Sequence, residues 1–367
     1  RSYRSSRRAM ISNPYTMNFR RQAMTYECAR FFRTPRTWIV YSFFLTGLLL
    51  FSGLSIVENE QAQQIEANRF SYMAYTANKR FHDLSRPLMA GESEFLYEVH
   101  DVAGTLARRI EKGENATLEF VELKQGWDEL IEKADENGYP YEDFGYVSSV
   151  SAQAYVQQDE ICLDEDLVLL TSSWQPDAAN LNVQWILKGG WLGIALFCLL
   201  LWMDTVGAEV ESGTAKTVFT SSTPRKIIFK GKAIFSLCIP FVLNLTVFLV
   251  LGAAGFIHGS GTFMYPYIVN DHIMRGIWIL VSGWTLCACA MTGLFGLFLR
   301  VFSWRLKTMD AFCVCLLAVA VLFGAQAWNV SAVLTSRTWI LGIAGLAPAG
   351  ILLMFAALHV LERKELG

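Results

Sequence analysis

Six apolar runs, each long enough to cross a lipid bilayer, constrain this chain more than any other feature. A membrane-spanning helix needs about 20 mostly apolar residues. Only 17% of the residues are charged, whereas a soluble domain carries about 25%. The sequence therefore predicts an all-α polytopic membrane protein with six transmembrane helices. The predicted spans are residues 37–57, 184–206, 234–257, 274–299, 310–328 and 338–361.

Basic residues are segregated between the connections, and this segregation predicts the orientation. Residues 1–36 contain nine arginines and a single acid, Glu27. Further basic residues follow the second and fourth spans and fill the tail, residues 362–367. The short loops on the opposite side, residues 258–271 and 329–337, contain one basic residue, Arg337. Because basic loops stay on the cytoplasmic side, we expect a multi-pass plasma-membrane protein, of bacterial architecture, with both termini cytoplasmic.

Two segments outside the spans have a predicted structure of their own. In the arm, residues 1–36, aromatic side chains such as Phe31 and Phe32 alternate with arginines between residues 17 and 33, as in an interfacial amphipathic helix; a solvated basic tail is the alternative. Residues 58–183 hold 25 acidic and 9 basic residues, a formal charge of −16. They also show apolar residues at helical spacing, which predicts an extracellular helical domain. The spaced residues are Phe95, Val99, Val102, Leu106 and Ile110, and then Phe120, Leu123, Trp127, Leu130 and Ala134.

The connection between the second and third spans, residues 207–232, carries the most specific motif. A polar connection of about 25 residues is longer than a turn between two helices requires. Glu209 and Glu211 stand near the start of a short helix, where acidic side chains favour the N-terminal dipole. Such a helix, lying parallel to the membrane, can dock into a cleft on a cytoplasmic partner. The alternative is an ordinary basic loop that only fixes the topology.

The same connection resembles the cytoplasmic signature of the ABC-2 type transporter permeases. In that family an acid and Gly-Thr open a short helix, and a Ser-Ser-Pro-like turn with a basic residue leads to Gly-Lys at the third span. The proline here stands one place later than in the commonest form, and residues 216–220 replace a leucine-rich stretch. The matching residues are Glu211, Gly213, Thr214, Ser221, Ser222, Pro224, Arg225, Gly231 and Lys232.

The resemblance implies a function and a set of partners. Two permease subunits, identical or homologous, would pair and bind two cytoplasmic ATPase chains, which hold the ATP and Mg²⁺. Residues 209–226 would form the helix that couples ATPase closure to export, together with Gly231 and Lys232. The strongly acidic segment 58–183 favours a peptide or a cationic, amphipathic small molecule as cargo, although acidity can also serve only to keep that domain soluble.

The chain contains none of the common catalytic motifs. It has no Gly-x-x-x-x-Gly-Lys-[Ser/Thr] run, so we expect no enzyme activity and no cofactor in this chain, and ATP hydrolysis on a partner. Seven of the eight cysteines lie in apolar runs or the basic arm, which indicates packing residues rather than a disulfide framework. Two other classes stay open. One is a membrane sensor or scaffold that binds a ligand through its acidic domain. The other is a lipid-modifying enzyme, which lacks a cluster of His, Asp or Glu at one membrane depth.

Overall fold

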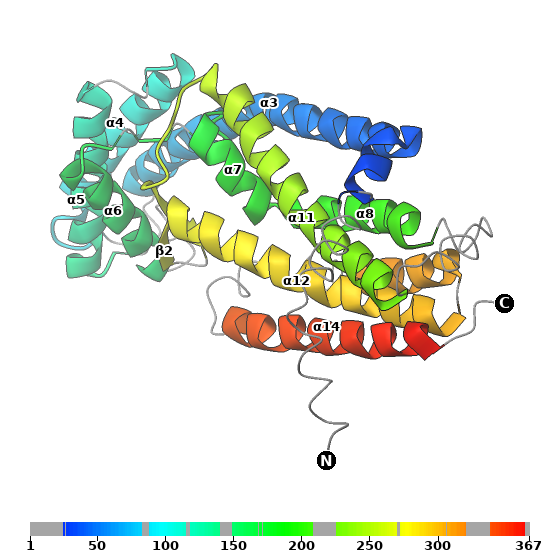
Figure 1. The fold of residues 1–367 in the computed structure, drawn as a ribbon. Coiled ribbons are helices and arrows are strands. Elements are labelled where there is room, and N and C mark those ends of the chain that lie inside the picture. The colour runs from blue at the N-terminus through cyan, green and yellow to red at the C-terminus, as the bar shows by residue number, and fades with distance from the viewer. Residues whose placement is uncertain are drawn as a thin grey trace. The chain divides into compact units, whose positions relative to one another are not determined.

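The chain divides into two compact units (Figure 1). Unit 1 comprises Arg1–Leu48, Trp185–Val250 and Val281–Gly367, and unit 2 comprises Leu49–Gln184 and Leu251–Leu280. The computed structural model describes residues 25, 27–82, 88–114, 118–139, 149–167, 169–170, 172–207, 225–269, 272–305, 307–320 and 338–363.

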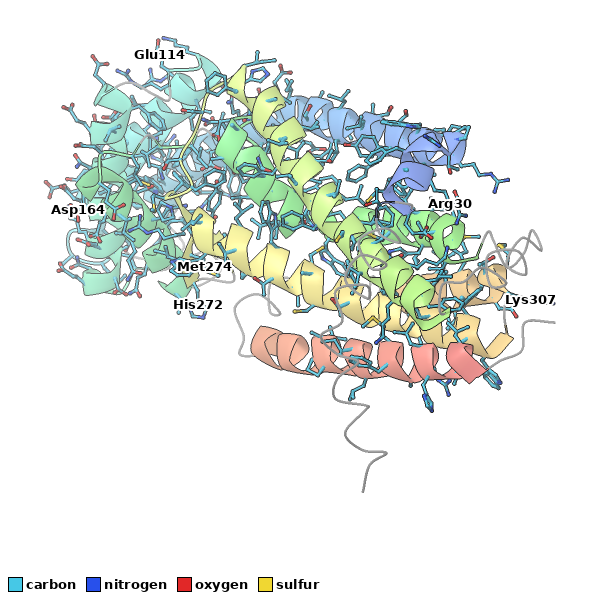
Figure 2. All side chains as sticks on the ribbon, viewed as in Figure 1. Arg30, Glu114, Asp164, His272, Met274 and Lys307 are labelled. Atoms are coloured by element: carbon cyan, nitrogen blue, oxygen red, sulfur yellow. The ribbon has the colours of Figure 1, made fainter. Side chains whose placement is uncertain are left out.

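Unit 2 contains a bundle of four helices around an apolar core. Its first helix is the outer part of α3 (Pro35–His82), which has 48 residues and therefore extends far beyond the predicted span 37–57. The others are α4 (Glu92–Glu111), α5 (Leu118–Asn137) and α6 (Ser149–Asp164). The predicted apolar faces of α4 and α5 form the core, with Trp127 and Leu106 completely buried. Charged side chains, such as those of Glu114 and Asp164, extend from the surface of the unit (Figure 2).

A two-stranded antiparallel sheet also belongs to unit 2, and the all-α prediction missed it. Strand β1 (Pro266–Val269) pairs with β2 (His272–Arg275), and Tyr267 lies opposite Met274. Most of strand β1 is buried, including Tyr267 and Val269, as is Tyr265 just before it. The two strands are too short to stand out in a sequence dominated by apolar helices.

Unit 1 contains most of the apolar helical length of the chain. It holds the start of α3, α8 (Trp191–Trp202), a π-helical turn η3 (Met203–Gly207) and most of α11 (Arg225–Phe256) and α12 (Gly276–Arg305). Helix α14 (Thr338–Arg363) packs closely on α12, since a Cβ added to Gly296 would lie 2.3 Å from the carbonyl oxygen of Gly350. Small residues allow this kind of close helix approach in membranes. Large apolar side chains, among them Phe241, Leu317 and Leu352, face outward.

The predicted second span is broken. Helix α7 (Ala178–Leu187) ends two residues before Gly189, whose φ of 79° is the left-handed conformation that favours glycine, and α8 begins beyond this turn at Trp191. The two helices are bent by 75°. A Cβ at Gly190 would also lie 2.2 Å from Trp185 Cε2, so only glycine fits at that position. Composition predicted one continuous helix because the two glycines interrupt only a short stretch.

The described residues contain three helices long and apolar enough to cross a membrane, or four if the bent pair is one span. These are Pro35–His82, Ile228–Phe256 and Gly276–Trp304. Two shorter apolar helices, Thr308–Ala320 and Gly345–Leu361, coincide with parts of the fifth and sixth predicted spans. The protein is thus mainly helical and embedded in a membrane by several apolar helices.

Candidate functional site

The predicted coupling residues fall partly on α11. This helix begins at Arg225 rather than near residue 234, so that Gly231 and Lys232 lie within its first turns. Both residues are buried. The other predicted coupling residues, apart from Arg225 at the start of α11, lie outside the described residues. They are Glu209, Glu211, Gly213, Thr214, Ser221, Ser222 and Pro224.

Lys232 forms a buried ion pair with the arm that precedes α3. Its Nζ lies 3.0 Å from Glu27 Oε1, and the two side chains are only 3% and 4% exposed. The same Nζ donates a hydrogen bond of 3.0 Å to the carbonyl oxygen of Thr205 in η3. Removing two charges from water is costly unless further hydrogen bonds satisfy them. Lys232 therefore joins three elements that are far apart in sequence: the arm, the end of the second span and the start of the third.

The π-helical turn η3 makes this contact possible. In a π-helix the backbone bonds run from i to i+5, and such turns occur often at functional sites. The Thr205 hydroxyl donates back to Leu201 O at 2.9 Å, and the carbonyl of Thr205 accepts the lysine. The last residue of η3, Gly207, is packed so tightly that an added Cβ would lie 1.5 Å from Thr308 Cγ2. Both ends of the segment 208–224 are thus attached to well-packed parts of unit 1.

The arm itself is helical between residues 27 and 33 and packs on α11. The Phe31 ring lies 5.2 Å from the Phe235 ring in an edge-to-face arrangement, which aromatic pairs favour. Trp202 of α8 donates a 3.0 Å hydrogen bond from its indole nitrogen to Ser236 O of α11. These contacts hold the arm, α8 and α11 together around the ion pair.

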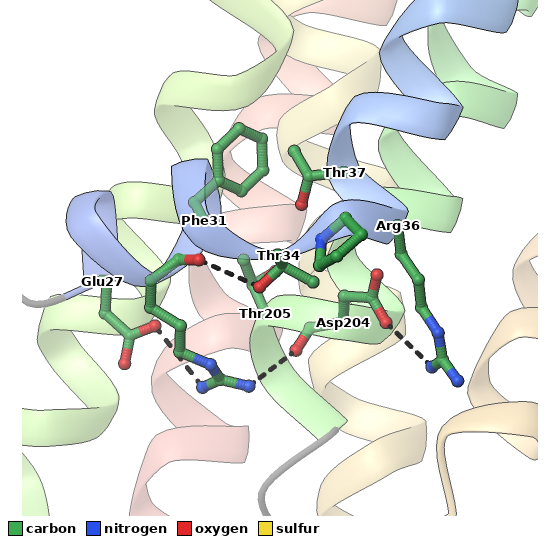
Figure 3. A pocket seen from close by; sticks show the side chains of 9 residues that line it. Glu27, Phe31, Thr34, Arg36, Thr37, Asp204 and Thr205 are labelled. Atoms are coloured by element: carbon green, nitrogen blue, oxygen red, sulfur yellow. Dashed lines mark hydrogen bonds and ion pairs between the residues drawn. The ribbon is translucent and has the colours of Figure 1, made fainter.

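A polar cavity of about 370 Å³ lies beside the ion pair (Figure 3). Arg30 donates to the carbonyl oxygen of Asp204 at 3.3 Å, and its other nitrogen lies 3.8 Å from Glu27 Oε2. On the opposite side Arg36, whose side chain is 79% exposed, lies 3.6 Å from Asp204 Oδ1. Thr34, at the break between the arm and α3, donates to Arg30 O at 2.9 Å. The cavity is therefore lined by two arginines from the arm and by the end of the second span.

Unit 2 contains a second cluster of buried charge, at the contact between α5 and α6. Asp128 and Asp159 are 8% and 5% exposed and face each other. Lys124 Nζ lies 2.9 Å from Asp159 Oδ2, but Asp128 Oδ1 has no hydrogen-bond partner among the described residues. Burial, together with the neighbouring Asp159 carboxylate, raises the pKa of Asp128 to about 8. A carboxyl group that holds its proton near neutral pH therefore lies inside the unit.

The hairpin is attached to α6 by a surface ion pair. Arg275 of β2 binds the Glu165 carboxylate through both terminal nitrogens, at 2.6 and 2.5 Å, a bidentate arrangement that fixes orientation. The guanidinium holds the pKa of Glu165 below its usual range. Cys162, on the same helix, is completely buried, and burial raises the pKa of its thiol to about 12. Cys162, the one cysteine in the polar segment 58–183, is thus a buried free thiol.

Sequence reasoning singled out Lys232 but missed its partners. Glu27 had a recognisable signal, because it is the one acid in an arm with nine arginines. Asp204 and Thr205 lie at the end of the predicted span 184–206, and neither they nor Arg30 carry a distinguishing signal in the sequence. Within the part of the chain that the structure describes, no group of three or more His, Cys, Asp or Glu side chains could hold a metal ion.

No family model, curated protein or solved structure matches this chain. The family resemblance consequently depends on the motif residues of the segment 207–232 and on the plan of the predicted spans.

Proposed function

We propose that this chain is the membrane-spanning permease subunit of an ATP-binding-cassette exporter. The observation that carries the proposal is the position of Gly231 and Lys232. They end the motif that resembles the ABC-2 permease signature, and Lys232 bonds to the arm through Glu27 and to the second span through Thr205. A displacement of the segment 208–224 would therefore be transmitted to three elements of unit 1: the arm, the end of the second span and the start of α11.

In this proposal the ATP and Mg²⁺ belong to two copies of a cytoplasmic ATPase. Closure of the ATPases moves the helix formed by residues 209–226, and α11 carries the motion along its 32 residues. A second permease subunit, identical or homologous, completes the path. The ligand must bind the inward-open and outward-open states with different affinities, since equal affinity would shift neither state.

The proposed orientation places the basic arm and the segment 207–232 in the cytoplasm and the acidic helices α4 to α6 outside. Six spans with both termini cytoplasmic, in the plasma membrane of a bacterium, satisfy the distribution of basic residues. The charge of −16 on residues 58–183 favours a cationic or amphipathic cargo such as a peptide.

Replacing Lys232 with Met tests the proposal. The readout is the ATP-dependent change in the alkylation rate of Phe256→Cys, an exposed position at the far end of α11, in the purified complex with its ATPase. We expect the ATP effect to fall by roughly tenfold, since coupling free energies of about 1–3 kcal/mol correspond to 5- to 150-fold. Lys230→Met, two residues earlier on the same helix, should leave it unchanged.

A second variant separates coupling from folding. Lys232→Met alone breaks the buried pair and leaves Glu27 with only its longer, 3.8 Å contact to Arg30; breaking a buried pair costs about 3–5 kcal/mol. The double variant Glu27→Gln, Lys232→Met removes the buried carboxylate as well and should recover stability but not the ATP effect. An ATP effect as large in both Lys232 variants as in the unmodified protein would contradict the proposal.

A further inference from the structure

An apolar cavity adjoins the polar cavity of Figure 3. Its volume is about 210 Å³, and Phe31 and Thr37 line both cavities. The remaining wall comes from the start of α3, the end of α8 and the first half of α11. Besides Phe31 it includes Trp38, Tyr41, Phe235, Val242 and Leu243.

The polar groups of the two amphipathic aromatic side chains in that wall are already hydrogen-bonded to the protein. Tyr41 shares a 2.9 Å hydrogen bond with Thr246, and the indole nitrogen of Trp38 donates to Phe32 O at 2.8 Å. Their rings therefore present carbon to the cavity. A water molecule there would find few partners, whereas a hydrocarbon chain would lose nothing by entering.

The polar cavity next to it is electrostatically suited to an anion. Glu27 is neutralised by Lys232 at 3.0 Å, and Asp204 is the one other acid that lines the described cavity. Two arginines also line it. Arg30 lies 3.8 Å from Glu27 Oε2, and Arg36 lies 3.6 Å from Asp204 Oδ1. Arg33, between them in the sequence, is exposed on the arm. The side chain of Arg36 is 79% exposed. Its guanidinium can therefore bind a second anion while it stays paired with the Asp204 carboxylate.

The two adjoining cavities together favour an amphiphilic ligand. An inorganic anion would use the arginines but not the aromatic cavity, and a neutral hydrocarbon would use the aromatic cavity but not the arginines. The two cavities lie where the basic arm meets the apolar part of α3, the level at which lipid headgroups meet acyl chains. The ligand that fits both is a membrane lipid with a negative headgroup.

We propose that the two cavities form one binding site for an anionic phospholipid, with its phosphate at Arg30 and Arg36 and an acyl chain along Trp38, Phe235 and Val242. The occupied site would connect the arm to α11 beside the Glu27–Lys232 pair. This site requires only that the chain is embedded in a membrane, so it does not depend on the proposed exporter function.

The test measures lipid retention by the purified full chain, without any ATPase. The probes are phosphatidylglycerol and phosphatidylcholine with identical acyl chains, counted by native mass spectrometry. We expect phosphatidylglycerol to be retained at least fivefold better. Arg36→Gln should lower its retention roughly fivefold, because one basic residue near an anionic lipid contributes about a fivefold factor. Val242→Trp, which fills the apolar cavity, should lower retention of both lipids.

Two further variants guard against unfolding and against general charge effects. Asp204→Asn removes the competing acid and should increase phosphatidylglycerol retention, an effect that damage to the fold cannot produce. Arg300→Gln removes an exposed arginine at the end of α12, outside the cavities, and should change nothing. Equal retention of the two lipids, or an effect of Arg300→Gln as large as that of Arg36→Gln, would overturn the lipid site. Either result would leave the exporter proposal standing.

Discussion

Helices α4 and α5 of unit 2 bury their apolar faces around Trp127, whereas helices α11 and α12 of unit 1 expose large apolar side chains such as Phe241. Each unit also buries a few charged side chains: Asp128 in unit 2, and the paired Glu27 and Lys232 in unit 1. The same kind of secondary structure is thus built for two solvents. In the first unit the apolar surface can face lipid, and polar groups gather where elements must be joined.

The largest expected effect is a loss of stability that is confined to unit 2. Trp127→Ala removes the largest completely buried side chain of the core of unit 2 and should cost about 3–5 kcal/mol. Backbone amides of α4, α5 and α6 should lose protection in hydrogen exchange, and those of α12 between residues 281 and 305 should keep theirs. Gln125→Ala, an exposed change on the same helix, is the control. Equal loss of protection in both units would mean that they unfold as one.

A smaller effect concerns the buried carboxyl group of unit 2. The folded-state pKa of Asp128 is about 8, above its unfolded value of about 4. The folded state therefore holds a proton that the unfolded state has released, and stability should fall as the pH rises from about 4 to about 8. Asp128→Asn mimics the protonated form. It should flatten this dependence and raise the melting temperature at pH 9 by several degrees.

The matched control for that experiment is Glu129→Gln, the neighbouring exposed acid. It should leave the pH dependence as it is, since its carboxylate stays in water in both states. Lys124 and Glu160 also act on Asp128, the lysine lowering and the glutamate raising its pKa, but burial has the largest influence. A melting temperature of the Asp128→Asn protein that changes with pH as in the unmodified protein would show that another group controls this behaviour.

Local pattern was sufficient to predict the core of unit 2 and the positions of several apolar helices. The helical spacing of Phe95, Val99 and Leu106 predicted the buried face of α4. Helices α4 and α5 are followed by Gly113 and Gly138, whose φ of 70° and 69° is the left-handed conformation that favours glycine. Helical spacing predicts the buried face of a helix in water, because apolar residues on one face recur with the helix period. The length of an apolar run predicts a membrane span, because the bilayer thickness sets a minimum length.

Features that depend on distant partners could not be predicted. The burial of Lys232 requires both Glu27 and Thr205, which are separated from it by very different lengths of chain. At the bend near Gly189 the Trp185 ring fills the space beside Gly190, and the hairpin is held by Glu165, just after α6, which binds Arg275. The motif identified Lys232 as important without showing what it touches.

The exporter proposal requires that the segment between Gly207 and Arg225 binds a cytoplasmic ATPase. The most direct measurement places a photo-activated benzophenone amino acid at Phe219 and irradiates intact cells that express the full chain. We expect a crosslink to a soluble nucleotide-binding ATPase, with a yield that changes when ATP is depleted. The same probe at Glu119, an exposed position on α5, should give none. Crosslinks from Phe219 to lipid alone, or labelling of a cysteine at that position by an impermeant thiol reagent added outside the cell, would contradict it.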